Sequence, residues 1–236
     1  MLDKIVEEDC KLIIKYLNLK KLNRKKILIL GGNSFLASYI QAVLTFINCK
    51  VTSISQNKPK GIIRSIDKKN FKFVKIDLNN EKKLKKIFSK KFDYIFHFAT
   101  YGQPKKWKNN EISTINLNTN LLRVILDHSV RFKTKIIYAS SAAVYELSNG
   151  KSLINEKSKL TVGKFDNEII YANSKIIGEQ LCRLYKEKFK IPVNVIRPAH
   201  TYGPGQDFND PRIIPQLIKR AFLNRHIHIY DKGLSV

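Results

Sequence analysis

Residues 25–40 read KKILILGGNSFLASYI, and this stretch decides the fold class. An apolar run typical of a buried strand leads into a glycine turn, and the turn leads into a helical pattern. That order is the layout of a phosphate-binding loop, in which the N-terminus of a helix faces an anion. A dinucleotide-binding loop carries glycine at the positions of Gly31, Ser34 and Ala37. Only Gly31 is kept, so the stretch by itself leaves a cofactor role open.

The two replaced glycines change the loop to different degrees. The second glycine of such a loop lets the backbone approach a pyrophosphate, and the third permits close packing of the helix. Alanine at the third position adds one methyl group and is a mild change. Serine at the second position is the larger departure, although its hydroxyl can donate to a phosphate at the helix N-terminus. The candidate cofactor contacts of the loop are Gly31, Ser34, Phe35 and Leu36.

Downstream of this junction, apolar strand-like runs alternate with amphipathic segments. The predicted strands cover residues 26–30, 50–55, 71–76, 94–99, 135–140 and 193–198. The clearest helical patterns cover residues 2–18, 81–93, 115–128 and 169–189. Apolar strands that alternate with helices predict a parallel sheet covered on both faces. We therefore expect a doubly wound α/β fold, which binds ligands beyond the carboxyl ends of its strands.

The composition excludes some classes of protein. At 236 residues with 43% apolar side chains, the chain has room for one packed domain, or for one domain and part of another. Its net charge of +25 is compatible with a nucleic-acid partner. The lysines, however, fill the solvent side of helical patterns, and no zinc or aromatic RNA-binding pattern accompanies them. We predict no nucleic-acid role, and we expect the positive field to attract phosphorylated ligands.

The sequence also bears on location. No apolar stretch approaches the roughly 20 residues that span a bilayer, and the acidic start MLDKIVEEDC is unlike a secretory signal. The cysteines Cys10, Cys49 and Cys182 are scattered and odd in number, so they fit neither a disulfide framework nor a metal site. We expect a cytoplasmic protein with no membrane span and no metal.

Candidate proton-transfer residues follow the fifth predicted strand. Ser141 lies in the segment SSAAVY, and the later segment YANSK places Tyr171 and Lys175 four residues apart on one face of a helix. A free tyrosine has a pKa of about 10, and a nearby positive charge lowers that pKa and favours the phenolate. Such a tyrosine can take a proton from a substrate hydroxyl while hydride leaves the same carbon, which is worth ~10²–10⁴-fold in rate.

With these motifs in order, the chain resembles the extended short-chain dehydrogenase/reductases of the NAD-dependent epimerase/dehydratase family, which act on nucleotide sugars. The resemblance runs from about residue 25 to the last residue and rests on six segments: GGNSFLAS, the Asp77–Leu78 pair, FHFAT, SSAAVY, YANSK and RPAHTYGPGQ. It implies a Rossmann-like sheet that binds NAD or NADP, followed by the start of a smaller C-terminal substrate lobe. The variant HTYGPG resembles a branch linked to bacterial surface-polysaccharide synthesis.

The resemblance also implies roles for single residues. The implied cofactor contacts are Asp77 and Leu78 at the adenine, Phe98, Ala99 and Thr100 at the ribose and phosphates, and Pro198 in the last motif. Ser141 would hydrogen-bond the reacting oxygen, Tyr171 would transfer the proton, and Lys175 would hold the nicotinamide ribose. His200 stands near the expected substrate phosphates, where the family usually has asparagine.

The end of the second predicted strand departs from the family. An acidic residue there usually binds the adenosine ribose hydroxyls and favours NAD over NADP. This chain has Ser55, Gln56 and Asn57 instead, followed by Lys58 and Lys60, which could meet a 2′-phosphate. Ser55 is the candidate cofactor contact at this point, and the choice between NAD and NADP stays open.

The two residues after Ser141 bear on the reaction. Dehydratases that resemble this chain carry an Asp-Glu pair there, and decarboxylases of the family tend to carry a glutamate, whereas this chain has Ala142 and Ala143. Alanine cannot move a proton, so elimination chemistry is disfavoured. A 4-epimerase needs only the removal and return of hydride around a rotating keto-sugar. A 4-keto-sugar reductase needs the same residues with a reduced cofactor. We predict an epimerase, with a reductase as the alternative.

We expect three parts: an N-terminal helical extension (1–24), an NAD(P)-binding domain (25–200) and the beginning of a substrate lobe (201–236). Such a lobe needs more residues than the chain has, which predicts a fragment, or a non-catalytic dinucleotide-binding protein if the chain is complete. The family also implies a homodimer through the helices that carry NLLRVIL and YANSK. The N-terminal helix is predicted to form one apolar face from Leu2, Ile5, Val6, Leu12, Ile13, Tyr16 and Leu17.

Overall fold

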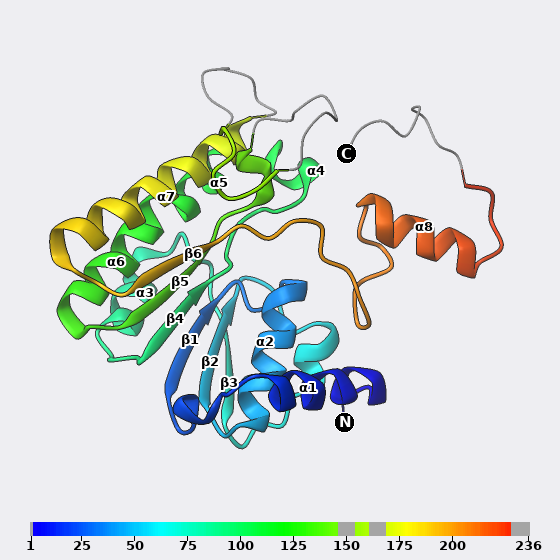
Figure 1. Ribbon diagram of the computed structural model, residues 1–236, viewed down its shortest axis with the longest axis horizontal. Coiled ribbons are helices and arrows are strands. Elements are labelled where there is room, and N and C mark those ends of the chain that lie inside the picture. The colour runs from blue at the N-terminus through cyan, green and yellow to red at the C-terminus, as the bar shows by residue number, and fades with distance from the viewer. Residues whose placement is uncertain (1, 146–153, 161–168, 228–236) are drawn as a thin grey trace.

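The computed structural model describes residues 2–145, 154–160 and 169–227 and contains a six-stranded parallel sheet with helices on both faces (Figure 1). The strands are β1 (Lys26–Leu30), β2 (Lys50–Ser55), β3 (Phe71–Lys75), β4 (Tyr94–His97), β5 (Lys135–Ala139) and β6 (Val193–Ile196). Their order in the sheet is β3-β2-β1-β4-β5-β6. The predicted doubly wound fold is confirmed, and each strand ends at its predicted last residue or up to two residues before it.

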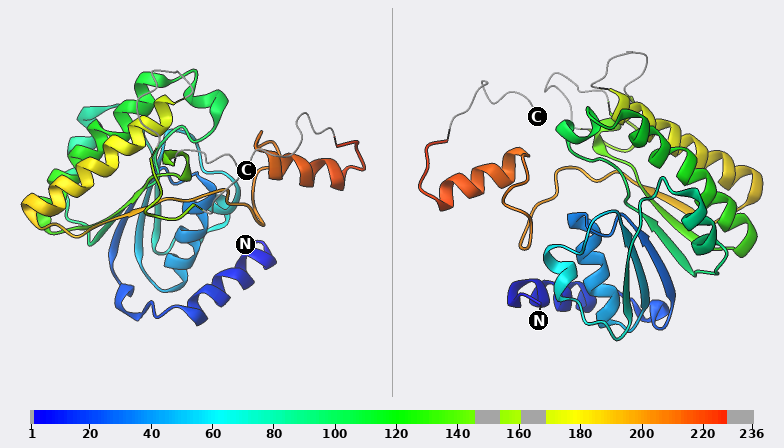
Figure 2. Two further views of the ribbon diagram at one scale, coloured as in Figure 1. Left: turned by 45° about the horizontal axis from the view of Figure 1, so that its top comes forward. Right: turned by 180° about the vertical axis from the view of Figure 1, so that it is seen from behind.

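The helices form one layer on each face of the sheet (Figure 2). One layer contains α1 (Lys4–Tyr16), α2 (Phe35–Phe46) and the short helix η2 (Gly61–Ser65). The other contains α3 (Glu81–Phe88), α5 (Glu111–Asn118), α6 (Asn120–Phe132) and α7 (Ile170–Phe189). The remaining short helices are η1 (Lys20–Leu22), α4 (Pro104–Trp107) and η3 (Ala142–Val144). Helix α8 (Ile213–Phe222) follows β6 and stands beside the two layers, with Ile213 and Phe222 largely exposed (Figure 1).

Strand β1 shows why the sheet is buried on both faces. Leu28 and Leu30 pack with the layer of α3, α6 and α7, whereas Ile27 and Ile29 pack with the layer of α1, α2 and η2. All four side chains are fully buried. A strand covered on both faces must be apolar at every position, which is why an unbroken apolar run predicts a central parallel strand.

The position of β1 also sets where a ligand can bind. Leu30, its last residue, pairs with Ile54 of β2 on one side and with His97 of β4 on the other. The three strands therefore end together at one edge of the sheet. The strand order reverses between β1 and β4, because the chain builds outward from β1 in one direction and then crosses to β4 to build outward in the other. Such a switch point opens a crevice at the carboxyl ends of the strands.

The N-terminal helix forms as predicted, but its predicted buried face is only partly right. Asp3 caps α1 by accepting a 3.0 Å hydrogen bond from the backbone N–H of Ile5. Val6 and Cys10 are fully buried, and Leu2 and Ile13 are half-buried against the same layer. The other predicted members, Ile5, Leu12, Tyr16 and Leu17, are 49–78% exposed. Helical spacing groups residues on a face, but apolar residues cover more of α1 than the narrow stripe that reaches α2.

The predicted boundaries after residues 24 and 200 stay a prediction. Helix α1 shares a core cluster with α2 and η2 through Val6 and Cys10, so the extension packs directly on the helices of that layer. At the other end, β6 is an edge strand whose Val195 and Ile196 are exposed. The end of the predicted substrate lobe, residues 228–236, lies outside the described residues.

We predict that Gly31→Ala destabilises the fold. Gly31 has a φ of +82°, and a Cβ there would lie 2.5 Å from the Ala99 backbone nitrogen and 2.6 Å from the Phe98 carbonyl carbon. Backbone atoms cannot move aside cheaply, so we expect a loss of about 2 kcal/mol or more in the free energy of unfolding by urea. Gly102→Ala is the matched control, because its nearest atom is Thr100 Cγ2 at 4.0 Å. Equal stability of the two variants would contradict this account.

Candidate active site

The residues predicted for ligand binding follow the carboxyl ends of all six strands and therefore lie along one edge of the sheet. They are Gly31, Ser34, Phe35 and Leu36 after β1, Ser55 at the end of β2, Asp77 and Leu78 after β3, Phe98, Ala99 and Thr100 after β4, Ser141 after β5, and Pro198 and His200 after β6. Helix α7 adds Tyr171 and Lys175 from its first turns.

The loop after β1 has the shape of an anion site. The positive φ of Gly31 turns the chain toward α2, and Ser34 is the N-cap residue of that helix. Ser34 makes no capping hydrogen bond with its side chain, and its Oγ is buried without a partner in the described part of the chain. Phe35 and Leu36 follow half-buried in the first turn. A buried hydroxyl without a partner at a helix N-terminus is well placed to donate to an anion.

Asn33 ties this loop to the one after β2. Its Nδ2 donates to the carbonyl oxygens of Asn57 (3.2 Å) and Lys58 (2.9 Å), and its Oδ1 accepts from the backbone N–H of Lys60 at 3.3 Å. Ser55 is half-buried at the start of that segment. Asn33 of the glycine loop thus holds the segment after β2 in place. This is the segment in which the acidic residue usual in the family is missing.

The residues predicted for the adenine side line the neighbouring strand end. Leu78 is buried, whereas Asp77 is exposed, and its carboxylate accepts a 3.0 Å hydrogen bond from the backbone N–H of Asn79. This contact closes the turn that precedes α3. The Asp77 carboxylate is therefore engaged in a turn, and the apolar surface at this strand end comes from Leu78.

The strand end of β4 is linked to α7 through Asn118. Phe98 and Ala99 are buried, and Thr100 Oγ1 accepts a 3.2 Å hydrogen bond from Asn118 Nδ2. The same amide group donates to Ser174 Oγ at 2.9 Å. The helical run breaks at Thr119, between α5 and α6, directly after this residue. Asn118 thus fixes the distance between β4 and the helix that carries the candidate proton-transfer residues.

Ser141, Tyr171 and Lys175 come together around the end of β5. The Ser141 side chain hydrogen-bonds the Tyr171 phenol, which is 8% exposed. Lys175 is 1% exposed, and its Nζ donates to the carbonyl oxygen of Ala139 at 2.6 Å. This Nζ lies 4.8 Å from the centre of the Tyr138 ring and 5.8 Å from that of Tyr171. The structure brings the three predicted residues together, with the lysine directed at the end of the strand.

The expected lowering of the tyrosine pKa is wrong for the chain without a ligand. Burial raises the pKa of Tyr171, while the hydrogen bond from Ser141 and the charge of Arg212 act in the opposite direction. Burial also lowers the pKa of Lys175 to about 7. The interior therefore disfavours the charged form of both groups.

Trp107, the single tryptophan of the chain, lies flat on Tyr171. The two ring centres are 4.8 Å apart with an angle of 9° between the planes, and the indole N–H is buried without a partner in the described part of the chain. Trp107 ends the short helix α4, whose first turn is held by the carbonyl oxygen of Gln103. The candidate proton donor is thus covered on one face by a residue from the loop after β4.

The segment before α8 also reaches the surroundings of Tyr171, because the charge of Arg212 acts on that phenol. Arg212 pairs with Asp210 through two nitrogens, with Nη2–Oδ2 at 2.6 Å and Nε–Oδ1 at 3.0 Å, and Asp210 is 7% exposed. The side chain of Gln103 hydrogen-bonds the same carboxylate, and these bonds lower the pKa of Asp210. The loop that carries Trp107 and the segment that leads to α8 are therefore joined above Tyr171.

The remaining predicted residues, Pro198 and His200, lie in the segment after β6, next to η3. Ala142 and Ala143 form η3 directly after Ser141, and Ser141 Oγ accepts a 3.1 Å hydrogen bond from the N–H of Ala143. Ala142 N–H donates to the carbonyl oxygen of Pro198 at 3.0 Å, which joins η3 to the segment after β6. Pro198 is half-buried and His200 is exposed. No side chain of η3 can carry a proton.

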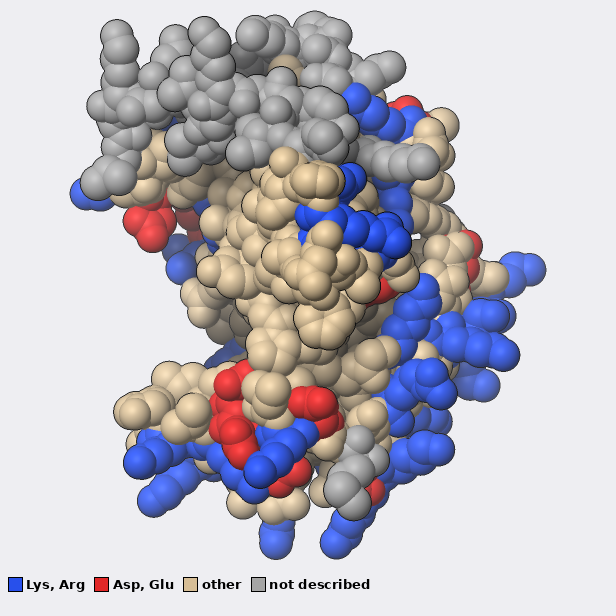
Figure 3. Space-filling view, turned by 90° about the vertical axis from the view of Figure 1, so that its right-hand side faces the viewer, with Lys and Arg blue, Asp and Glu red and all other residues tan. Residues whose placement is uncertain are grey.

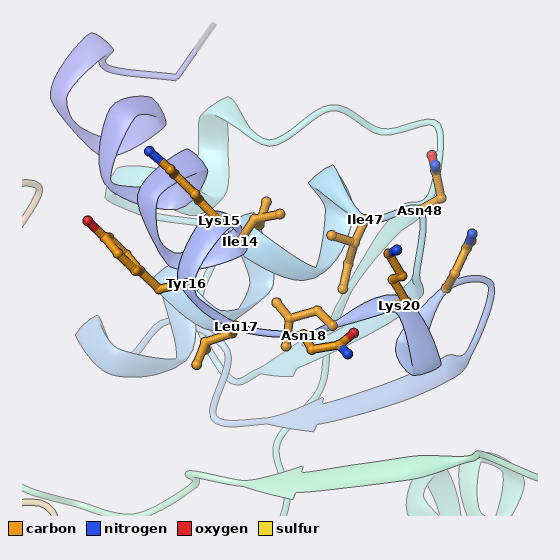
Figure 4. Close-up of a pocket in the computed structure, with 10 residues that line it drawn as sticks. Ile14, Lys15, Tyr16, Leu17, Asn18, Lys20, Ile47 and Asn48 are labelled. Atoms are coloured by element: carbon orange, nitrogen blue, oxygen red, sulfur yellow. The ribbon is translucent and has the colours of Figure 1, made fainter.

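A separate pocket of about 580 Å³ lies between the end of α1, η1 and the end of α2 (Figure 4). Its lining includes Ile14, Tyr16 and Lys20, together with Ile47 and Asn48. The last two precede β2, so the pocket lies at the amino edge of the sheet, opposite the candidate site.

The surface carries its positive charge unevenly. On the face shown in Figure 3, Lys and Arg side chains gather along one side, and acidic side chains form a smaller group. Such a surface creates a positive field that attracts phosphorylated ligands over several ångströms. Among the residues that the structure describes, no helix combines the length and the apolar character needed to cross a bilayer.

Sequence patterns missed several residues of this site. Asn33, Asn118 and Trp107 contact residues that are far away in the chain, so no local periodicity marks them. A signal was available for two of them. Asn118 is a polar residue on a buried helix face, and Trp107 is the single tryptophan, placed in a strand-end loop. The Asp210–Arg212 pair carried no such signal.

Curated relatives are similar to most of this chain. A dTDP-D-glucose 4,6-dehydratase from Dictyostelium discoideum is 30% identical in an alignment of 229 positions that covers 89% of this chain and 51% of that protein. UDP-glucuronic acid decarboxylase 1 from Xenopus tropicalis is 25% identical in an alignment of 226 positions that covers 93% of this chain and 51% of that protein. The chain thus spans about half the length of these two relatives.

Solved structures share the fold. UDP-N-acetylglucosamine 4-epimerase from Methanobrevibacter ruminantium superposes with a TM-score of 0.76 at 24% identity, covering 89% of this chain and 67% of that one. UDP-glucuronic acid 4-epimerase from Bacillus cereus, in complex with NAD, has a TM-score of 0.72 at 25% identity, covering 88% of this chain and 66% of that one. Epimerases, dehydratases and decarboxylases are thus all similar to this chain.

A comparison with protein-family sequence models gives a match over most of the chain. The sequence model of the NAD-dependent epimerase/dehydratase family matches residues 27–236, from the start of β1 to the last residue. The match includes every predicted site residue and leaves out α1 and η1. The chain therefore belongs to the NAD-dependent epimerase/dehydratase family.

Proposed function

We propose that the chain acts as an NAD(P)-dependent nucleotide-sugar epimerase that works by transient oxidation at a sugar hydroxyl. The observation that carries this proposal is the Ser141–Tyr171 hydrogen bond beside an η3 helix that holds only alanines and a valine. The site therefore has one route for moving a proton at one carbon. Dehydration and decarboxylation, the reactions named for the two curated relatives, need further acid–base groups at the positions of Ala142 and Ala143.

The chain's own residues would act as follows. Ser141 holds the reacting sugar oxygen, and Tyr171 takes the proton from that oxygen and later returns it. Lys175 anchors the ribose next to the tyrosine and carries a proton more readily once a ligand supplies oxygen atoms around it. Bound NAD or NADP supplies the acceptor for the hydride. Because Tyr171 has a raised pKa in the free chain, the phenol keeps its proton until a ligand changes its surroundings.

The loop after β1 fits a dinucleotide. Gly31 leaves no room for a side chain against Phe98 and Ala99, which keeps the backbone at the strand end free for close approach. Ser34 Oγ is buried without a partner and can donate to a pyrophosphate oxygen. Leu78 and Ser55 would border the adenosine, and Thr100, Pro198 and Lys175 the nicotinamide half. The NAD complex of the Bacillus cereus relative supports NAD slightly over NADP.

Two alternative functions are compatible with the same residues. A 4-keto-sugar-nucleotide reductase would use Ser141, Tyr171 and Lys175 in the same way with a reduced cofactor. A non-catalytic dinucleotide-binding protein would use only the loop after β1 and the strand ends.

We place the enzyme in surface-polysaccharide synthesis because of its HTYGPG segment, with the exposed His200 facing the substrate phosphates. We place it in the cytoplasm, since Cys10, Cys49 and Cys182 are all free thiols.

We also propose a homodimer, formed through α5 and α7. These helices pack side by side and expose Ile112, Ile115, Ile177 and Leu184, which are 41–77% exposed. The NLLRVIL leucines of α6 are buried in the core, so α5 takes the part expected of α6. Exposed apolar patches of this kind mark interfaces.

We predict a sedimentation mass near twice the 27.3 kDa of the chain at micromolar concentration, and a monomer for Leu184→Glu. A monomeric wild type would contradict the proposal.

We predict that Tyr171→Phe removes turnover and keeps cofactor binding. The variant retains the ring that stacks on Trp107 and loses only the hydroxyl that hydrogen-bonds Ser141. Turnover of a nucleotide sugar should fall by ~10²-fold or more, with the Kd for NAD unchanged within about three-fold. Tyr185→Phe on the same helix is the control, because the Tyr185 hydroxyl bonds Asp127 away from the site. Turnover that survives in Tyr171→Phe, or is absent from the wild type, rules out the proposed mechanism.

We predict that Ser34→Ala weakens dinucleotide binding about two- to ten-fold, the range expected for one hydrogen bond. The change keeps the volume and removes the hydroxyl that has no partner in the free chain. Calorimetric titration of NAD and of NADP into both proteins measures the effect and ranks the two cofactors. Ser38→Ala is the control, because the Ser38 hydroxyl bonds the Phe35 carbonyl oxygen within α2. Tighter binding by Ser34→Ala would mean that Ser34 crowds the pyrophosphate.

A further inference from the structure

Helix α1 lies outside the residues that match the family, and the proposed reaction gives it no role. Its two fully buried residues, Val6 and Cys10, face α2 and η2. The segment after β6, which carries the HTYGPG motif, comes down to the same place, as both ribbon views show (Figures 1 and 2). Helix α1 therefore lies against α2 and η2 and also next to the segment after β6, which carries the proposed substrate residue His200.

Tyr39 on α2 is the point where these three elements meet. Its hydroxyl lies 3.0 Å from Asp9 Oδ2 on α1 and 3.0 Å from the carbonyl oxygen of Pro204. A tyrosine hydroxyl has a single proton, so the two acceptors share one donor. Burial and the hydrogen bond to Asp9 raise the pKa of Tyr39, which keeps this proton in place at every physiological pH. The hydroxyl thus links α1 to the segment after β6.

The two glycines on either side of Pro204 pass close to apolar side chains of the same elements. A Cβ on Gly203 would lie 3.4 Å from Cζ of Phe35, and one on Gly205 would lie 2.9 Å from Cδ1 of Ile62. The same Cβ on Gly205 would lie 3.7 Å from Cγ2 of Val6 on α1. Gly205 has a φ of +80°, so this close approach depends on glycine. The segment thus lies close to the first turn of α2, η2 and α1, and Tyr39 hydrogen-bonds it at Pro204; we call this arrangement the clamp.

The clamp connects the two halves of the proposed site. Phe35 belongs to the proposed cofactor loop, and Tyr39 follows one turn later, with its ring edge-on to Phe35 at 5.4 Å. His200, proposed for the substrate phosphates, precedes the clamped glycines by only a few residues. The position of the substrate segment is therefore set by the same helix whose N-terminus would hold the pyrophosphate.

We propose that Tyr39, backed by α1, is a positioning residue that holds residues 200–206 against the first turn of α2 and so sets the affinity for the nucleotide sugar. Tyr39 acts through the segment and touches no reacting group. The inference rests on the proposed function for the identity of the ligand. The clamp itself rests on the contacts of Asp9, Tyr39 and Pro204.

The test is Tyr39→Phe in the full chain, with Tyr16→Phe as the matched control. Both changes remove one phenol hydroxyl, but Tyr16 lies on α1 with 78% of its surface exposed. We expect amide hydrogen exchange in residues 200–206 to speed up about three- to ten-fold in Tyr39→Phe, the range for one lost hydrogen bond, with β1 unaffected. The KM for UDP-glucose or UDP-N-acetylglucosamine should rise by a similar factor, with kcat and the Kd for NAD unchanged within about two-fold. Tyr16→Phe should match the wild type in all four measurements.

Exchange in residues 200–206 that is unchanged in Tyr39→Phe overturns the inference. Faster exchange throughout the chain, β1 included, overturns it as well, because Tyr39 would then support the fold as a whole. Faster exchange confined to the segment with an unchanged KM also overturns it, since the clamp would not reach the ligand. A wild-type chain that binds neither sugar nucleotide disproves the proposed function and the ligand role of the clamp together. The exchange comparison between the two variants keeps that outcome distinct from a failure of the clamp alone.

Discussion

The close approach of Gly31 to the Phe98–Ala99 peptide is the constraint on which the rest of the site depends. It occurs where the chain leaves β1 and passes the end of β4, the two strands between which the strand order reverses. Any side chain at position 31 would push these strand ends apart. The parallel strands bring their six ends to one edge, and this contact holds the loop before α2 at the switch point of the sheet.

Burial then decides the charge state of the candidate catalytic groups. Lys175 has its pKa lowered to about 7 and gives its hydrogen bond to Ala139, while the pKa of Tyr171 is raised. Both shifts have the same cause, because a buried charge without a partner costs several kcal/mol. The same arrangement makes the pair depend on a ligand, because oxygen atoms near Lys175 favour its charged form and that charge favours the phenolate. In the proposed reaction, ligand binding would therefore change the charge state of both groups.

The sequence predicted the parts of the molecule that local patterns encode. The six strands, the turn at Gly31 and the grouping of Ser141, Tyr171 and Lys175 follow from apolar periodicity and short motifs. The buried face of α1 did not follow, because Ile5 and Leu12 are as apolar as Val6 and only the packed partner selects between them. The stacking of Trp107 on Tyr171 and the Asp210–Arg212 pair depend on where two loops meet in space. The pKa of Tyr171 depends on burial, which spacing along a helix cannot reveal.

The Trp107–Tyr171 stack has a consequence for any ligand that reaches the tyrosine. Aromatic pairs of this kind contribute about 0.5–1.5 kcal/mol beyond their buried area. A sugar or nicotinamide ring that needs the covered face must displace the indole, and this cost lowers its apparent affinity. The indole N–H is buried without a partner in the described part of the chain, so it becomes a donor to a ligand only where the groups that cover it move. Because Gln103 joins the Trp107 loop to Asp210, motion of the indole would also move the segment before α8. Under the proposed function, the lower-cost route leaves the stack intact and would place a sugar substrate at the hydroxyl of Tyr171, beside Ser141.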